Sequence, residues 1–127
     1  MLKRGFVEVQ TPILQMNPGG AVAKPFKTKS QTSRNKFYLR ISLELYLKKL
    51  IILGLNKVFE LGKVFRNEGL STAHNFEFTV LEAYISFTCY KSLLKLTYCL
   101  ICFLTIKLIG ACLVLRYQKY KISVFNV

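Results

Sequence analysis

The chain has 127 residues, is 52 % hydrophobic and carries a formal net charge of +13. This length suits one domain with a modest core. The basic balance fits a polyanionic partner such as RNA or a phosphorylated ligand, and fits a solvated basic surface equally well. One Cys-x-x-Cys pair without a second pair argues against a secreted disulfide scaffold and against a zinc site. We therefore expect a reducing, cytoplasmic location.

The elements of the first half can be taken in chain order. Val7 and Val9 alternate with polar residues, which predicts a strand of roughly five residues that Pro12 closes. The segment NPGGA, residues 17–21, predicts a flexible backbone that can approach a ligand closely. Residues 24–36 predict an exposed basic loop, and residues 37–41 predict a short strand.

A helix is expected next. Leu43, Leu47 and Leu50 have helical spacing, Ser42 can cap the helix, and Gly54 suits the position after its end. Two strand-like segments follow, residues 57–66 and 77–85, joined by NEGLSTAHNF. They predict an antiparallel β-hairpin.

The composition changes near residue 90. The last of the six acidic residues is Glu82, whereas six of the 19 basic residues lie beyond residue 90. Residues 90–104 predict a helix. The mostly apolar run 96–115 is long enough to span a bilayer, but a charge such as Lys107 costs roughly 2.5–3.5 kcal/mol on insertion scales. We expect an apolar helical tail with small buried thiols at Cys99 and Cys102, and no membrane partner.

The second strand of the hairpin carries unusual chemistry on one face. Successive strand side chains point to opposite faces. One face therefore presents Phe78, Val80, Glu82 and Tyr84, and the other, which we expect to be ordinary core, presents Thr79, Leu81, Ala83 and Ile85. A ring, a carboxylate and a phenol in a row are costly to bury without partners, and a cationic ligand would supply them.

The loop of the hairpin adds cations. Arg66 and Glu68 follow the first strand, and His74, the only histidine of the chain, lies in the loop. Cations beside an aromatic ring suit a nucleotide, because they can bind phosphate oxygens while the ring stacks on the base. A surface hairpin with salt bridges explains the same spacing.

Four segments carry a family resemblance. VFRNEGLSTAHNFEFTVLEAY, residues 64–84, resembles motif 2 of class II aminoacyl-tRNA synthetases, in the form found in lysyl-tRNA synthetases. GFVEVQTPIL resembles the end of motif 1, and NPGGAVAKPF and FYLRISLELYLKKLIILG resemble further family segments in the expected order. The resemblance covers about residues 4–92. It implies an α+β fold in which residues 1–92 form part of the class II antiparallel catalytic sheet with flanking helices, and residues 93–127 form the tail.

The resemblance implies that the ancestor activated lysine with ATP and esterified it to tRNA-Lys. By position, Arg66 would be the catalytic residue, bridging the lysine carboxylate and the ATP α-phosphate. Glu68 would accept from the adenine amino group, Phe78 would stack on the ring, and His74 would meet ATP. The lysine side would be formed by Gly20 and Glu44 at the α-ammonium, with Glu82 and Tyr84 along the side chain. These acceptors suit a substrate with two ammonium groups better than an acidic one.

The sequence also departs from the family pattern. Phe76 stands where the family usually has proline, and Lys29 and Ser30 stand where it often has histidines. The motif 1 helix, motif 3, the anticodon-binding OB domain and the acidic ligands of the expected Mg²⁺ have no counterpart in this sequence, and no other metal is implied. We therefore expect a truncated catalytic fragment that is inactive alone and whose family homodimer is compromised. The alternatives are a paralogue that modifies a protein, or a non-enzymatic remnant with a membrane-associated tail.

Overall fold

A computed structural model describes residues 1–32, 35–69, 74–110, 114–117 and 120–123. Its helices are the 3₁₀ turn η1 (Leu2–Arg4), α1 (Glu44–Ile52) and α2 (Tyr90–Ile109). Its strands are β1 (Val7–Glu8), β2 (Leu14–Gln15), β3 (Lys27–Lys29), β4 (Lys36–Leu39), β5 (Lys57–Phe65), β6 (Glu77–Ile85), β7 (Val114–Tyr117) and β8 (Tyr120–Ser123). The chain divides into two compact units, Met1–Phe87 and Thr88–Val127. The fold is α+β, as predicted.

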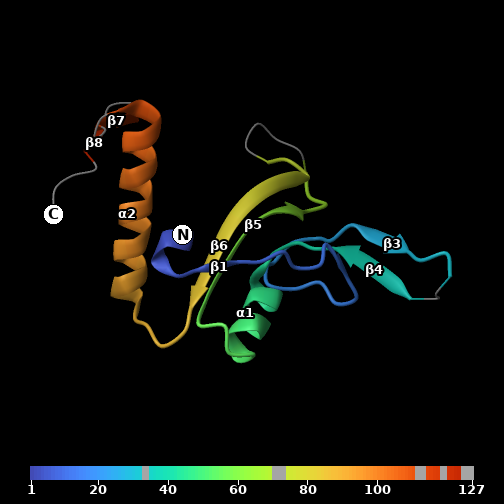
Figure 1. Cartoon of the computed structure of the whole chain (residues 1–127). Coiled ribbons are helices and arrows are strands. Elements are labelled where there is room, and N and C mark those ends of the chain that lie inside the picture. The colour runs from blue at the N-terminus through green and yellow to red at the C-terminus, as the bar shows by residue number, and fades with distance from the viewer. Residues whose placement is uncertain (33–34, 70–73, 111–113, 118–119, 124–127) are drawn as a thin grey trace. The chain divides into compact units, whose positions relative to one another are not determined.

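The predicted hairpin is the main structure of the first unit. β5 and β6 pair antiparallel from Lys57 opposite Ile85 to Phe65 opposite Glu77, and β1 pairs parallel to β5 (Figure 1). Arg66 lies one residue beyond β5, and its backbone N–H extends the ladder by donating to the Phe76 carbonyl at 2.8 Å. The strand-like segments, the first of them rich in Val and Phe, therefore predicted both strands almost to the residue.

A second sheet, in the order β2-β4-β3, joins the hairpin at the end of β5. The Arg40 N–H donates to the Ile13 carbonyl at 2.9 Å, and the Phe65 N–H donates to the Arg40 carbonyl at 2.9 Å. Strand β3 lies within the predicted basic loop, and its residues Lys27–Lys29 are exposed, as expected for that loop. Residues 33 and 34 of that loop lie outside the described residues. The predicted first strand is shorter than expected, at two residues.

Helix α1 supplies the core of the first unit. It begins where the Glu44 N–H donates to Ser42 Oγ at 3.1 Å, and it ends before Gly54, whose φ of +101° is the left-handed conformation expected there. The fully buried side chains form one cluster that joins the helix to the hairpin: Leu43, Leu47, Val58 and Val64. Phe78, Val80 and Tyr84 pack against this cluster.

The face of β6 that holds this packing is the opposite of the predicted core face. Thr79 is exposed, Leu81 is 43 % exposed, and Leu61 opposite it is 62 % exposed. The predicted core is thus present only at one end of that face, where Ala83 and Ile85 are half-buried and Phe59, opposite Ala83, is buried against Phe6. Because α1 packs on the face of Phe78, Val80 and Tyr84, one face of the hairpin serves both as core and as candidate site.

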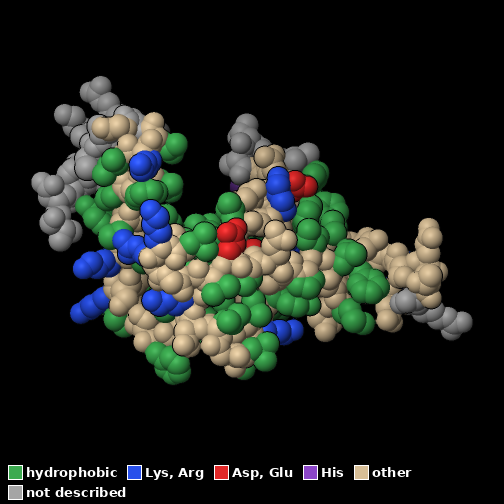
Figure 2. All heavy atoms as spheres, in the orientation of Figure 1, with side chains coloured by type: hydrophobic (Ala, Val, Ile, Leu, Met, Phe, Trp, Pro, Cys, Tyr) green, Lys and Arg blue, Asp and Glu red, His purple; other side chains and the backbone are tan. Residues whose placement is uncertain are grey.

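The second unit contains α2 and the antiparallel pair β7–β8. Hydrophobic and basic side chains are both exposed along α2 (Figure 2). Cys99 and Cys102 are half-buried on it, not fully buried as expected, and Cys112 lies outside the described residues. Within the described part of the chain, no helix is both long and apolar enough to cross a membrane.

Candidate active site

Backbone hydrogen bonds fix the position of Arg66 at the open end of the β5–β6 hairpin. Three consecutive amides donate to three separate segments: Phe65 to Arg40, Arg66 to Phe76 and Asn67 to Lys24, at 2.9, 2.8 and 2.7 Å. The Arg66 side chain is oriented as well, since its Nε donates to the Ile41 carbonyl at 3.3 Å. The guanidinium therefore has a defined place at the mouth of the hairpin.

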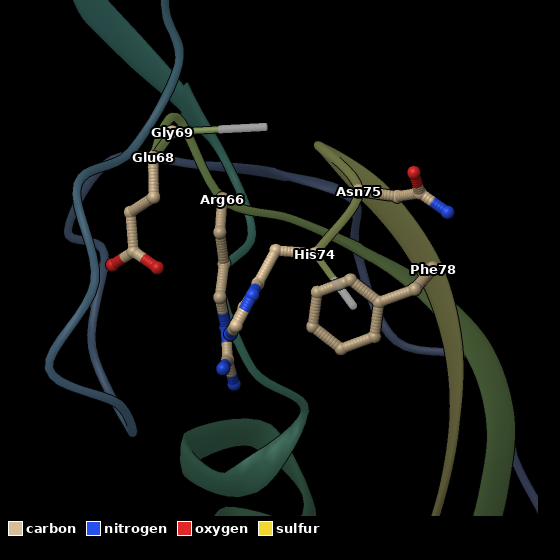
Figure 3. Close-up of a pocket in the computed structure, with 6 residues that line it drawn as sticks. All are labelled: Arg66, Glu68, Gly69, His74, Asn75 and Phe78. Atoms are coloured by element: carbon tan, nitrogen blue, oxygen red, sulfur yellow. The ribbon is translucent and has the colours of Figure 1, made fainter. Parts of the chain in front are cut away.

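A pocket of about 340 Å³ opens beside this arginine. The described residues that line it are Arg66, Glu68, Gly69, His74, Asn75 and Phe78 (Figure 3). The Phe78 ring turns toward Arg66, whose guanidinium carbon lies 5.0 Å from the ring centroid, whereas the Asn75 side chain points away (Figure 3). All four residues predicted to contact ATP therefore line one pocket. Residues 70–73 of the predicted loop lie outside the described residues.

The pocket combines two kinds of binding group. A guanidinium forms strong, oriented hydrogen bonds to phosphate oxygens, and an aromatic ring offers a flat apolar face to a base. Glu68 adds a carboxylate that accepts hydrogen bonds from an amino group. The volume lies within the range of small-molecule sites.

A second cluster of polar groups lies further along the same face of β6. Glu82 Oε1 accepts from Ser42 Oγ at 3.3 Å and from the Leu43 N–H at 3.4 Å, and Glu82 Oε2 accepts from the Tyr84 hydroxyl at 3.2 Å. Burial, followed by the nearby carboxylates of Glu82 and Glu44, raises the pKa of Tyr84 above its usual value. Its phenol therefore remains protonated and keeps donating to Glu82.

Gly20 and Glu44 complete this second cluster. Gly20 has a φ of +86°, and a Cβ placed on it would lie 2.9 Å from Glu44 Cβ and 2.9 Å from Ser42 Oγ. Glu44 Oε1 is paired with Lys48 Nζ at 2.6 Å. The four residues predicted for lysine are thus brought together around Ser42. They do not line the first pocket, since Glu82 is four residues, or about 13 Å, along the strand from Phe78.

A buried ion pair joins β5 to the residue that follows β4, and the sequence reasoning missed it. Arg40 Nη1 lies 2.7 Å from Glu60 Oε1, with side chains 4 % and 3 % exposed. Arg40 also donates to the carbonyls of Lys63 and Thr11, and Glu60 Oε2 accepts from the Thr11 N–H and hydroxyl. The strand pattern gave no signal for it: Glu60 shares the face of Val58 and Val64, and this face is known to be the core only from the structure, where a buried carboxylate needs a cation.

Phe76, which stands where proline was expected, has a contact of its own. Its ring meets Phe26 edge-on, with centroids 5.7 Å apart and planes at 89°. Such aromatic pairs contribute about 0.5–1.5 kcal/mol beyond their buried area. The returning end of the hairpin loop is therefore held by a side-chain contact with the segment before β3.

The described residues do not offer a metal site, since no three of their His, Cys, Asp and Glu side chains are grouped so as to hold an ion. The Mg²⁺ expected from the resemblance therefore finds no set of ligands among them, and no chemical step is assigned to it.

Comparison with known families decides the ancestry. Residues 1–123 match the family described as class II tRNA synthetases for D, K and N. The chain belongs to this family. The matched range of this synthetase chain extends beyond residue 92, where the motif resemblance ended.

Its curated relatives include several lysine–tRNA ligases. That of Buchnera aphidicola (subspecies Baizongia pistaciae) is 51 % identical over 110 residues, which are 87 % of this chain and 22 % of the relative. That of Saccharolobus solfataricus is 55 % identical over 97 residues, 76 % of this chain and 20 % of the relative. That of Enterococcus faecalis is 54 % identical over 93 residues, which are 73 % of this chain and 19 % of the relative. The synthetase chain thus spans about a fifth of the length of these relatives.

Proposed function

We propose that this chain forms the ATP- and lysine-binding part of the catalytic site of a lysine–tRNA ligase, which activates lysine with ATP and transfers it to tRNA-Lys. One observation carries the proposal: a cationic, aromatic pocket and an acceptor-rich cluster lie along the same face of β6. The first suits the nucleotide and the second suits an ammonium-bearing amino acid. About 50 % identity to lysine–tRNA ligases supports this assignment.

In the activation step, a carboxylate oxygen of lysine attacks the α-phosphorus of ATP. The new bond is a carboxyl–phosphate anhydride, and the bond from the α-phosphorus to the bridging oxygen breaks, so pyrophosphate leaves. Arg66 stabilises the negative charge that gathers on the α-phosphate oxygens. Removal of one such oriented group commonly slows a reaction by about 10²–10³. A hydroxyl of the tRNA terminus then attacks the anhydride carbonyl, which forms the ester and releases AMP.

The remaining pocket residues select the nucleotide. Phe78 stacks on the base, His74 contacts the phosphates, and Glu68 accepts a hydrogen bond from the adenine amino group. Guanine presents a carbonyl oxygen at that position, which a carboxylate repels. ATP is therefore favoured over GTP.

The second cluster selects lysine. Glu82 and Tyr84 lie along the substrate side chain, and Gly20 and Glu44 lie at the α-ammonium. Glu44 exchanges its ion pair with Lys48 for one with the substrate. A substrate without these ammonium groups leaves acceptor capacity of the half-buried Glu82 unused, and a mismatch of this kind gives specificity.

The finer architecture follows from the same proposal. The sheet β1-β5-β6 corresponds to part of the class II antiparallel catalytic sheet, within a catalytic segment of residues 1–92; the tail that follows, residues 93–127, holds most of α2 and, in place of the helix expected throughout, the strand pair β7–β8. The reaction takes place in the cytoplasm, where ATP, lysine and tRNA meet.

The test is nucleotide binding to the 127-residue chain by calorimetry. Arg66→Ala removes a charged hydrogen-bonding group, worth about 1.5–3 kcal/mol, and should weaken ATP binding roughly 10- to 150-fold. Arg4→Ala is the matched control, because Arg4 is an exposed arginine in η1 whose loss changes the net charge equally. It should leave ATP affinity unchanged.

The nucleotide comparison sharpens this test. ATP should bind more tightly than GTP, and Glu68→Gln should reduce that preference. Equal affinities of the Arg66→Ala and Arg4→Ala variants would show that only net charge attracts ATP. Equal binding of GTP and ATP to the unsubstituted chain would refute the proposed adenine contacts.

A further inference from the structure

Ser42 is a buried polar residue that the sequence pattern predicted only as a cap for the helix and to which the family resemblance assigned no role. It is 6 % exposed and lies between β4 and α1. Its hydroxyl contacts two residues of the second cluster, which is proposed to bind lysine and is called the lysine cluster below. Ser42 Oγ lies 3.3 Å from Glu82 Oε1 and 3.1 Å from the backbone nitrogen of Glu44. Ser42 is therefore a bridge between the helix start and β6.

The chemistry of these two contacts fixes the direction of both hydrogen bonds. A hydroxyl has one proton to donate and lone pairs that accept. The backbone N–H of Glu44 can only donate, so it takes a lone pair of Ser42 Oγ. The single proton of Ser42 is then directed to Glu82, which as a carboxylate can only accept.

The Glu82 carboxylate has nearly filled its capacity for hydrogen bonds. Carboxylate oxygens offer about four lone-pair sites. Ser42, the Leu43 N–H and Tyr84 supply three donors. About one site remains for a substrate, and its direction is set by the other three.

Gly20 explains why residue 42 is small. A Cβ on Gly20 would lie 2.9 Å from Ser42 Oγ and 3.1 Å from Ser42 Cβ, so the glycine backbone is packed directly on the serine. Serine is the smallest side chain that carries a hydroxyl, and it fits under this backbone. Space and hydrogen bonding thus act together at one position.

We propose that Ser42 is a positioning residue for amino-acid selection: its hydroxyl orients the Glu82 carboxylate so that the remaining acceptor site receives the side-chain ammonium of lysine. This inference rests on the proposed function. Without the Ser42 hydroxyl, Glu82 keeps its charge but loses one of the donors that orient it. The preference for a cationic over an isosteric apolar side chain then falls.

The experiment compares L-lysine with L-norleucine, which has a methyl group in place of the ammonium, by calorimetric titration of the 127-residue chain. Ser42→Ala should bind lysine about tenfold more weakly, with norleucine and ATP affinities unchanged. The matched control is Ser86→Ala. Ser86 also donates through its hydroxyl, to the Asn56 carbonyl and Oδ1 at 3.2 and 3.0 Å, but lies beyond the end of β6. It should behave as the unsubstituted chain.

A second measurement separates positioning from general support of the fold. If Ser42 acts through Glu82, then Ser42→Ala made in a Glu82→Gln background should cause no further loss of lysine affinity. Ser42→Cys retains a weak donor of similar shape and should lie between serine and alanine. Native-state hydrogen exchange of the α1 amides, unchanged from the unsubstituted chain, reports that the helix stays docked in each variant.

The possible results are distinct. Equal loss of lysine and norleucine binding, or additive losses in the double variant, would overturn the proposal, since both indicate a structural role. Lysine binding by Ser42→Ala as tight as by the unsubstituted chain would overturn it as well, and would leave the proposed function intact. If the unsubstituted chain does not prefer lysine to norleucine, the proposed function itself fails.

Discussion

Replacing Glu60 with glutamine tests the buried ion pair between β5 and Arg40, the residue that follows β4. Arg40 Nη1 and Glu60 Oε1 are 2.7 Å apart, and neither side chain is more than 4 % exposed. Removing one partner of a buried pair leaves an uncompensated charge and typically costs about 3–5 kcal/mol. Glutamine has the same shape and keeps one acceptor oxygen, so we expect the lower end, about 3 kcal/mol. That is a large part of the 5–15 kcal/mol typical of a domain.

The matched control is Glu77→Gln, which also removes one carboxylate from the hairpin. Glu77 pairs with Lys63 at 2.8 Å, but these side chains are 51 % and 54 % exposed, so the loss should be about 0–1 kcal/mol. The assay is urea unfolding at pH 7, followed by tyrosine fluorescence, at low and high salt. The small effect of Glu77→Gln should shrink with salt, whereas that of Glu60→Gln should persist. Equal destabilisation by the two substitutions would refute the reasoning.

Three further predictions follow from single residues. Tyr84 should ionise at higher pH than an ordinary tyrosine. This raised pKa stabilises the folded state fully below a pH of about 10, the pKa of tyrosine in the unfolded chain, and the stabilisation is lost as the pH rises through the pKa of the folded state. An ultraviolet titration checks this, since the ionisation at the highest pH should be absent from Tyr84→Phe. Cys89 is exposed, and the N–H and hydroxyl of Ser92 lower its pKa, so iodoacetamide should label it before Cys99 and Cys102; equal rates by peptide mass mapping would contradict this. Gly20→Ala should cost more than the ~1–2 kcal/mol of its positive φ, because the added Cβ would also lie 2.9 Å from Glu44 Cβ, and it should weaken lysine binding more than ATP binding in titrations.

The hairpin and its functional face were predictable because both depend on local pattern. Strand parity alone placed Phe78, Glu82 and Tyr84 on one face, and the paired register from Lys57 to Phe65 agrees. The functional roles of these residues came from the resemblance and stay proposals.

Which face of the hairpin is buried could not be read from that pattern. Leu81 and Glu82 point to opposite faces of β6 whichever face is buried. The buried face is decided by where α1 packs, and that packing is a long-range contact. Ser42 was missed as a partner of Glu82 for the same reason, since the two are 40 residues apart. Glu60 was missed for the same reason, since its parity with Val58 and Val64 indicates a buried carboxylate only once that face is known to be the core.

The sequence separation of these contacts has a consequence for the order of folding. β5 and β6 are separated by only the 11 residues 66–76, and a hairpin of this kind forms in about 1–10 μs. Arg66 and Phe78 therefore meet early, through local closure alone. The bond between Ser42 and Glu82 spans 40 residues and waits for α1 to dock, and longer loops close at greater entropic cost. The nucleotide pocket should thus form before the lysine cluster, and partial unfolding at α1 should abolish amino-acid selection while nucleotide binding survives.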